Sequence, residues 1–432
     1  MLISHPPAGD DATPTTGTRV EIAAAISAAF VSLLGDQVAR LAMAVLVLER
    51  THSAALSALA YALTMLPAIV GGPLLGGLAD RLPRRRVMIS SDVVRGVLVI
   101  APAVPGCPLA LGMAVVAVIA FLEAGFDAAR GALVADLAGE RYLSVLGWDR
   151  AVNQAAQVVG FATGGAVLLL VGARGALLLD AGTFLISASL LLLVRPRPRP
   201  AGAPSRANPL RTAWRDAAAG AAYVLRAPAR RRPVLLTCTV AAAAVLPEGL
   251  AASYARELHH PGPATAVLML ANPVGTMLGA AWLGRRADRC HDRYLRAWIG
   301  TAMVPLVGLL AGPAIAVVVA LLVVSGMGMS VSLISRSAFV AAVDPALRGR
   351  AFAFAGAALT VAQGASVAAA GVVASALGSV HLTLGAAGTV GLLGAMALSR
   401  APSRPAVEVD DALAHGRRDR LQLRVRAQLG EH

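Results

Sequence analysis

Long runs of apolar residues alternate with short polar breaks along most of this chain. A membrane-spanning helix needs about 20 mostly apolar residues, and only helices or closed barrels satisfy their backbone polar groups in lipid. The runs are too long and too continuous for the alternating pattern of barrel strands. The pattern therefore predicts an all-α integral membrane protein with twelve transmembrane helices, at 20–48, 54–79, 87–104, 109–129, 148–171, 175–194, 233–254, 264–284, 295–311, 314–335, 351–377 and 381–398.

The break after the sixth run is longer than the others and divides the chain into two six-helix halves, 20–194 and 233–398, with tails at 1–19 and 399–432. This linker, 195–232, begins with alternating Arg and Pro and continues with apolar residues at helical spacing. We expect an extended segment followed by an amphipathic helix at the membrane surface. Its ten arginines and single acid favour anionic lipid, although an ordinary basic cytoplasmic loop explains the same composition.

Composition supports the membrane assignment and narrows the chemistry. Hydrophobic residues make up 57% of the chain and charged residues 14%, whereas a soluble domain has about 25% charged residues. The three cysteines are far apart, so neither a disulfide framework nor a metal site is expected. The sequence has no lysine, which excludes a phosphate-binding loop of the G-x-x-x-x-G-K-[ST] type, and it has no H-E-x-x-H or G-x-S-x-G motif. No cofactor and no enzymatic activity are expected.

The net charge of +14 follows the predicted topology. If the N-terminus is inside, 25 of the 38 arginines fall in cytoplasmic loops and three in outer loops. Basic residues concentrate in cytoplasmic loops, so we expect a multi-pass protein of the cell membrane with both termini in the cytoplasm. The first 18 residues lack the pattern of a cleavable signal peptide. Because the arginines follow topology rather than one soluble face, no nucleic-acid partner is expected.

The two halves share an internal repeat. The pattern G-x-x-x-D-R occurs in the loop after the second predicted span, from Gly76, and in the loop after the eighth, from Gly284. Matches at nearly one offset indicate two homologous six-helix halves, the parallel-repeat organisation of one large class of transporters. Three further pairs repeat at a similar offset, namely Arg130 with Arg336, Gln157 with Gln363, and Gly165 with Gly371.

With these motifs the sequence resembles the major facilitator superfamily. The family's loop motif, G-x-x-x-D-R-x-G-R-R, stands at 76–86 with Pro83 in place of the inner glycine. The runs at 34–37, 91–95 and 180–185 resemble the efflux branch that includes macrolide and enterobactin exporters. The resemblance implies two pseudo-symmetric halves and secondary transport of a small molecule.

Two departures from the family pattern bear on proton antiport. The antiporter motif G-P-x-x-G-G appears at 160–165 with Phe161 in place of the proline. In the fourth span Phe121 stands where drug antiporters carry an arginine. The resemblance therefore implies transport more directly than proton antiport. The three glycines of the motif, Gly160, Gly164 and Gly165, are expected to permit close helix packing, with sliding during transport as the alternative.

Acids inside apolar spans are functional candidates, because an ionisable group in a membrane is costly unless it is paired or solvated. Asp36 and Glu248 lie at similar depth, roughly 24 and 22 Å along the first helices of the two halves. We expect them to face one central cavity and to contribute to proton or cationic-substrate binding, since a buried acid is easier to protonate than an exposed one. For Asp36, an i, i+4 pair with Arg40 that merely neutralises both charges is an equal alternative.

On the fourth span, Glu123, Asp127 and Arg130 share one helix face. Asp127 and Arg130 are better explained as a structural pair than as a proton pathway. Glu123 lies about 10 Å from Arg130 along the helix axis and is a candidate proton relay.

The basic loop that follows Gly76 suggests a conformational latch. The family resemblance implies that Asp80 ties the first half to the cytoplasmic start of the eleventh span, with Arg81 as its neighbour in the motif. We expect Arg84 and Arg85 to pair with acids on neighbouring helices, although the arginines of this loop also serve as topology determinants. Asp92 and Arg95, one turn apart in the third span, and Arg130 are expected to extend this network.

The function predicted from these features is proton-coupled efflux of a hydrophobic or amphipathic small molecule by alternating access. The expected partners are a small-molecule substrate, protons and membrane lipids, and the protein is expected to be a monomer. Proton-coupled uptake or facilitated diffusion of a polar solute is the nearest alternative. A non-transporting membrane sensor that uses the arginine-rich linker and tail is another.

Overall fold

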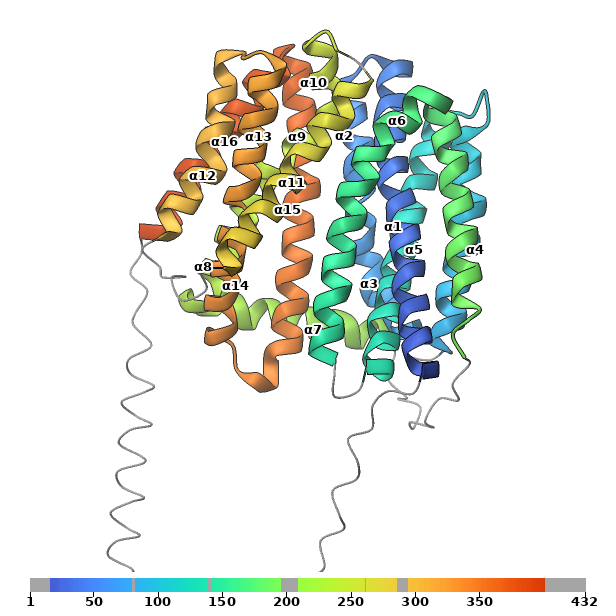
Figure 1. Ribbon diagram of the computed structural model, residues 1–432. Helices are drawn as coiled ribbons and strands as arrows, with labels where there is room; N and C mark the ends of the chain where they lie inside the picture. The colour runs from blue at the N-terminus through green and yellow to red at the C-terminus, as the bar shows by residue number, and fades with distance from the viewer. Residues whose placement is uncertain are drawn as a thin grey trace, which may run out of the picture.

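The structure, a computed structural model, describes residues 16–79, 82–138, 142–195, 209–260, 262–285 and 294–400. Throughout these ranges the secondary structure is helical, with no strand. The first half, on the right in Figure 1, contains α1 (Thr16–Thr51), α2 (Ala54–Leu63), α3 (Leu66–Ala79), α4 (Arg84–Ala103), α5 (Leu109–Ala138) and α6 (Tyr142–Leu191).

The second half follows the linker helix α7 (Pro209–Arg226) and lies on the left in Figure 1. Its first predicted span is broken into three helices, α8 (Pro228–Ala244), α9 (Leu246–Gly249) and α10 (Ala251–Glu257). The remaining helices are α11 (Pro263–Gly284), α12 (Leu295–Gly308), η4 (Leu309–Ala311), α13 (Ile315–Gly328), α14 (Val331–Ala342), η5 (Pro345–Leu347), α15 (Arg348–Leu377) and α16 (Val380–Arg400).

Each predicted span falls on a helix or on consecutive helices. Among the described residues, eight helices are long and apolar enough to cross a membrane, or nine if the bent pair α8 to α10 counts as one span. The long α6 holds two predicted spans, which meet at Gly172 with φ 67° and ψ 176°. A positive φ is easy for glycine and costly for other residues, so Gly172 allows the chain to turn between them. The prediction of an all-α membrane protein is confirmed.

The break in the first span of the second half lies next to a candidate residue. Helix α8 ends at Ala244, α9 contains Pro247, and the helices on either side of the break are bent by 56°. Proline removes a backbone donor and disrupts the helical hydrogen-bond ladder. Glu248 therefore lies in an irregular segment within the bundle, not in a continuous helix.

For clarity, we call the end of the bundle that holds Thr51, Glu257 and Val380 the upper end, and the end that holds Arg84 and α7 the lower end, as in Figure 1. Helix α7 lies crosswise beneath the other helices and packs against α3 of the first half and against α8 and α15 of the second. Between the two halves, α2 packs against α15 and α6 against α11. The two halves thus meet along a shared interface. Helix α7, which we call the strap, joins them at the lower end.

Within the first half, α1 packs against α6 more extensively than any other pair of described helices. Gly160 and Gly164 lie in this contact. A Cβ atom built on Gly160 would lie 2.7 Å from the Gln37 Cβ and 3.0 Å from the Leu34 carbonyl oxygen. A Cβ atom on Gly164 would lie 3.0 Å from a methyl group of Leu41. These distances support the packing role expected for the glycines, because small residues let helix backbones approach closely. Gly165 is buried beside them.

This geometry predicts the outcome of adding one methyl group. We expect Gly160→Ala to destabilise the protein by about 1–3 kcal/mol, because the α1 backbone has to move to make room. Gly182→Ala is the matched control, since a Cβ atom there meets nothing within 4 Å. It should be neutral or stabilising, because alanine favours a helix over glycine. Denaturant titration of both purified variants tests the difference, and equal stability would contradict the packing role.

Candidate functional site

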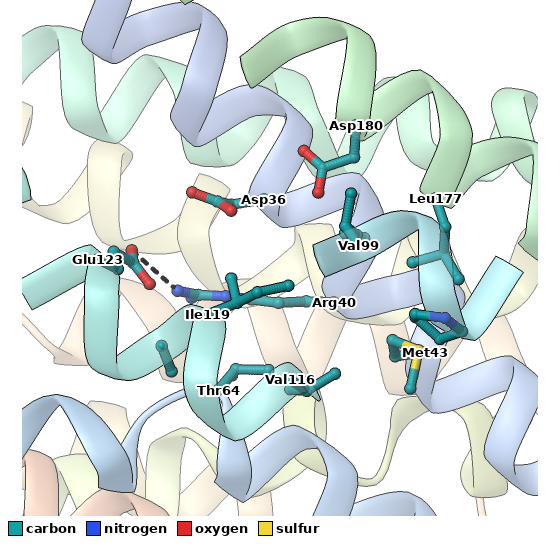
Figure 2. A pocket seen from close by; sticks show the side chains of 13 residues that line it. Asp36, Arg40, Met43, Thr64, Val99, Val116, Ile119, Glu123, Leu177 and Asp180 are labelled. Carbon is teal, nitrogen blue, oxygen red and sulfur yellow. Dashed lines mark ion pairs between the residues drawn. The ribbon is translucent and has the colours of Figure 1, made fainter. Parts of the chain in front are cut away.

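A small cavity of about 40 Å³ lies inside the first half, between α1, α4, α5 and α6. This volume holds about three water molecules and is too small for an organic substrate. Four ionisable side chains line it: Asp36, Arg40, Glu123 and Asp180. Figure 2 shows them converging on the cavity from different helices, with apolar neighbours such as Val99 around them. The sequence placed three of the four among the candidate residues, and the structure brings these three together.

Arg95 lies behind this cavity and is fully buried. Its guanidinium donates to the Asp92 carboxylate at 2.6 Å and forms a longer ion pair with Asp36 at 3.4 Å. The same group lies over the rings of Phe126 and Phe184, at 5.0 and 4.5 Å from their centres. Stacking on aromatic faces and pairing with carboxylates suit the planar guanidinium. Arg95 thus holds α4 against α1, α5 and α6.

The partners of Arg95 also fix Asp92. The Ser187 hydroxyl donates to the second Asp92 oxygen at 2.6 Å, and Arg95 donates to the Ser32 hydroxyl at 3.3 Å. Both acids paired with Arg95 are buried. Asp92 and Arg95 therefore belong to the intramembrane cluster that includes Asp36. Among the described residues the expected extension of the basic-loop network to Asp92 and Arg95 is not seen, because their partners lie on helices within the bundle.

Arg40 does not pair with Asp36, its neighbour on α1. Its guanidinium pairs with Glu123 of α5 at 3.5 Å (Figure 2). Asp36 pairs with Arg95 instead. The alternative of an Asp36–Arg40 pair along α1 is therefore not what the structure shows. Glu123 and Arg40 are each about one-sixth exposed, so this pair is in contact with the cavity.

Asp180 is the functional candidate that the sequence reasoning missed. It lies in the run 180–185 that carried a family resemblance, but it was not singled out as a site. The structure buries Asp180 against α1, where a Cβ atom on Gly35 would lie 2.3 Å from its carboxylate oxygen. The Thr183 hydroxyl donates to it at 3.1 Å. The rule that any intramembrane acid is a candidate would have found it.

The charges of this cluster do not balance when every group is ionised. The acids Asp36, Asp92, Glu123 and Asp180 face two guanidiniums, those of Arg40 and Arg95. An unpaired buried charge costs several kcal/mol, so the excess of acids favours uptake of a proton or another small cation. Among the described residues, no group of three or more acids, histidines or cysteines has a geometry that could hold a metal ion.

Glu248 lies outside the cluster around Asp36. It is buried at the broken span of the second half and accepts a hydrogen bond at 3.0 Å from the hydroxyl of Tyr61 on α2. Glu248 does not line the cavity that Asp36 lines, so the structure does not place the two acids together there. The first span of the second half is bent by 56° between Gly249 and Ala251, directly after Glu248. Arg40 also lies close enough to Tyr61 and Glu248 for an electrostatic interaction with both.

Further contacts between the halves lie at the upper end. Arg256 of α10 contacts the imidazole Nδ1 of His52 at 2.8 Å, and the Ala55 amide donates to the Ser375 hydroxyl at 3.0 Å. Gly371 of α15 lies directly against Ala58 of α2. Together with the Tyr61–Glu248 hydrogen bond, these contacts hold the halves together towards the upper end.

The basic loop at the lower end matches its prediction in part. Arg84 pairs with Asp136 of α5 and donates to the Ala132 carbonyl at 2.6 Å. Arg85 pairs with no acid in the part of the chain that the structure describes. It donates instead to the carbonyls of Leu191 and Leu192 at the end of α6, because the last carbonyls of a helix lack partners within the helix. The expectations for Asp80 and Arg81 lie outside the described residues.

Arg130, the other residue assigned to the latch, forms the structural pair expected with Asp127 at 3.2 Å. It also binds the Asp149 carboxylate, which ties α5 to the start of α6. These contacts are within the first half. They support a structural role for Asp127 and separate it from the cavity acids.

Solved structures share this arrangement of helices. The chain is similar to a mutant of the nucleoside transporter NupG, with 14% identity and a TM-score of 0.71 over 88% of this chain and 99% of that one. It is also similar to a bacterial homolog of the human lysosomal transporter Spinster, in an inward-facing and unoccupied conformation, with 14% identity and a TM-score of 0.68 over 90% and 98%. A bacterial homologue of the iron transporter ferroportin, in an inward-facing state, matches with 15% identity and a TM-score of 0.63 over 89% and 99%.

These identities are low, so the structures show the fold alone. No curated protein sequence matches the chain. The sequence profile of the Major Facilitator Superfamily, however, matches residues 25–247. This match covers slightly more than half of the 432 residues and includes nearly all of the first half, with its charged cavity. The chain therefore belongs to the Major Facilitator Superfamily and has the membrane transporter fold of that family.

Proposed function

We propose that this protein is a secondary transporter that exports a hydrophobic or amphipathic small molecule in exchange for protons, by alternating access. The observation that carries the proposal is the excess of buried acids over arginines around the cavity of Asp36, Glu123 and Asp180. Protons that enter this cluster from one side of the membrane and leave to the other would supply the driving force. The apolar walls of the bundle and the resemblance to the efflux branch support export.

Because the cavity is small, we assign it to proton coupling and not to substrate binding. About 40 Å³ admits water and protons but no drug-sized molecule. The substrate would then bind elsewhere, between the two halves, where alternating access exposes a surface to each side in turn. Glu248 and Tyr61 are two buried polar residues that meet at this interface. A substrate that bonds to Glu248 competes with Tyr61 and weakens the contact between the halves.

We further propose that the lower end faces the cytoplasm, since the cytoplasmic loops predicted from the arginines lie there. The contacts at His52, Ala55 and Tyr61 then close the outer side in this conformation. A change of protonation in the cluster would act on this closure through Arg40, which pairs with Glu123 and also interacts electrostatically with Glu248.

The Tyr61–Glu248 hydrogen bond provides the first test. In proteoliposomes with an imposed pH gradient, we expect Glu248→Gln to reduce gradient-driven movement of the amphipathic dye ethidium about tenfold or more, because the variant loses its charge between the halves. Tyr61→Phe should retain the charge and reduce the flux by a smaller factor, since a single hydrogen bond contributes about 1 kcal/mol.

Glu49→Gln is the matched control, because Glu49 is an exposed acid at the upper end of α1. It should transport like the unmodified protein. Full gradient-driven flux in Glu248→Gln would contradict the role of this residue. Gradient-driven flux of a nucleoside, with none of ethidium, would replace export of an amphipathic molecule by transport of a polar solute.

A further inference from the structure

A second, larger cavity lies at the lower end, beside α7. It has a volume of about 540 Å³ and is formed by α7, the start of α8, η5 and the start of α15. This volume is within the range of small-ligand sites, about 300–1,000 Å³. Its lining, as far as the described residues form it, contains three arginines and no acid: Arg226, Arg230 and Arg350.

One of these arginines, Arg230, is held in place but has a hydrogen-bond donor without a partner among the described residues. The guanidinium of Arg230 lies 3.7 Å from the centre of the Tyr223 ring, which fixes its plane. The Tyr223 hydroxyl in turn accepts a hydrogen bond from the Asp344 amide at 3.1 Å. The Nε atom of Arg230 is buried and has no hydrogen-bond partner among the described residues. A buried donor without a partner costs free energy, and an anion in the cavity would supply the acceptor.

The surrounding charges leave the cavity positive. Arg350 pairs with Asp216 of α7 at 3.1 Å, and both side chains are more than one-third exposed. Arg226 is exposed on the last turn of α7. Arg226 and Arg230 thus keep their charge available for a ligand. Helix α7 packs closely against the start of α15, since a Cβ atom on Gly220 would lie 2.6 Å from the Arg350 carbonyl oxygen.

We propose that this cavity, between Arg226, Arg230 and Arg350, is a binding site for a phosphate group, as carried by the head of an anionic phospholipid or by a soluble phosphate. Planar guanidiniums match phosphate oxygens in paired hydrogen bonds. Basic pockets at the ends of membrane helices are suited to anionic headgroups. Because α7 also packs against α3, a bound phosphate fastens the strap to the second half beneath the interface.

The experiment uses the full-length protein in detergent and counts bound ligand by native mass spectrometry. The probes are a short-chain phosphatidylglycerol, a short-chain phosphatidylcholine and inorganic phosphate. We expect saturable binding of one phosphatidylglycerol and weaker binding of the zwitterionic lipid. Arg226→Gln/Arg230→Gln should weaken phosphatidylglycerol binding roughly tenfold or more, since each arginine near an anionic headgroup contributes substantially. Arg226→Gln/Arg350→Gln, which leaves the stacked Arg230 in place, should also weaken it.

The matched control is Arg215→Gln/Arg231→Gln. It removes the same charge from exposed positions of α7 and α8 that do not line the cavity. It should bind phosphatidylglycerol like the unmodified protein. If inorganic phosphate displaces the lipid at similar concentration, the site serves a soluble phosphate; if it does not, the source is the lipid. Equal losses in the control and the cavity variants, equal binding of phosphatidylcholine, or no saturable binding would overturn the proposal.

Discussion

Arg95→Gln is expected to lower the free energy of unfolding by about 3–5 kcal/mol, the largest stability effect of any single substitution considered for this protein. Arg95 is fully buried, and its removal leaves the carboxylates of Asp36 and Asp92 without their cation. The stacking on Phe126 and Phe184 is lost as well. The measurement is denaturant titration of the purified protein in detergent, followed by tryptophan fluorescence.

Two further variants separate the loss of charge pairing from a general effect of substitution. Arg86→Gln removes an exposed arginine from the same helix and should change stability by less than about 0.5 kcal/mol. Arg95→Gln/Asp92→Asn removes both members of the shortest ion pair and should recover part of the lost stability, because fewer unpaired charges remain. If the double variant is less stable than Arg95→Gln, the buried pair is not the source of the effect.

Glu123→Gln is expected to have the largest effect on coupling. The amide cannot exchange a proton, and it leaves Arg40 without its partner at the cavity. In proteoliposomes that contain a trapped pH-sensitive dye, proton movement driven by an ethidium gradient should fall about tenfold or more. Movement of ethidium should no longer respond to an imposed pH gradient. Both measurements report coupling directly, whereas a folding defect would also reduce the yield of protein.

The control for this experiment is again the exposed acid Glu49, whose change to glutamine should leave proton movement unchanged. Asp180→Asn tests the acid found only in the structure. We expect it to reduce coupling in the same direction, because it lines the same cavity as Glu123. Normal proton movement in Glu123→Gln and in Asp180→Asn would move the coupling site away from this cavity.

The resemblance stated from the sequence agrees with the family found, because the loop motif, the repeat and the spans are all local features of the chain. The finer assignment to an efflux branch rests on short runs and stays a prediction. The same holds for the proposed membrane topology and for the latch at Asp80, which lies outside the described residues.

The sequence by itself determined the fold class, since a run of about 20 apolar residues has few options in lipid other than a helix. It also identified Asp36, Glu123 and Glu248 as costly intramembrane acids. Their partners depended on helix packing across large separations, so only the tertiary structure decided them. Asp36 pairs with Arg95 across 59 positions, and Glu248 meets Tyr61 across 187. The charge and apolarity of each residue follow from the sequence, whereas the balance of charges in a buried cluster is decided only when the helices pack.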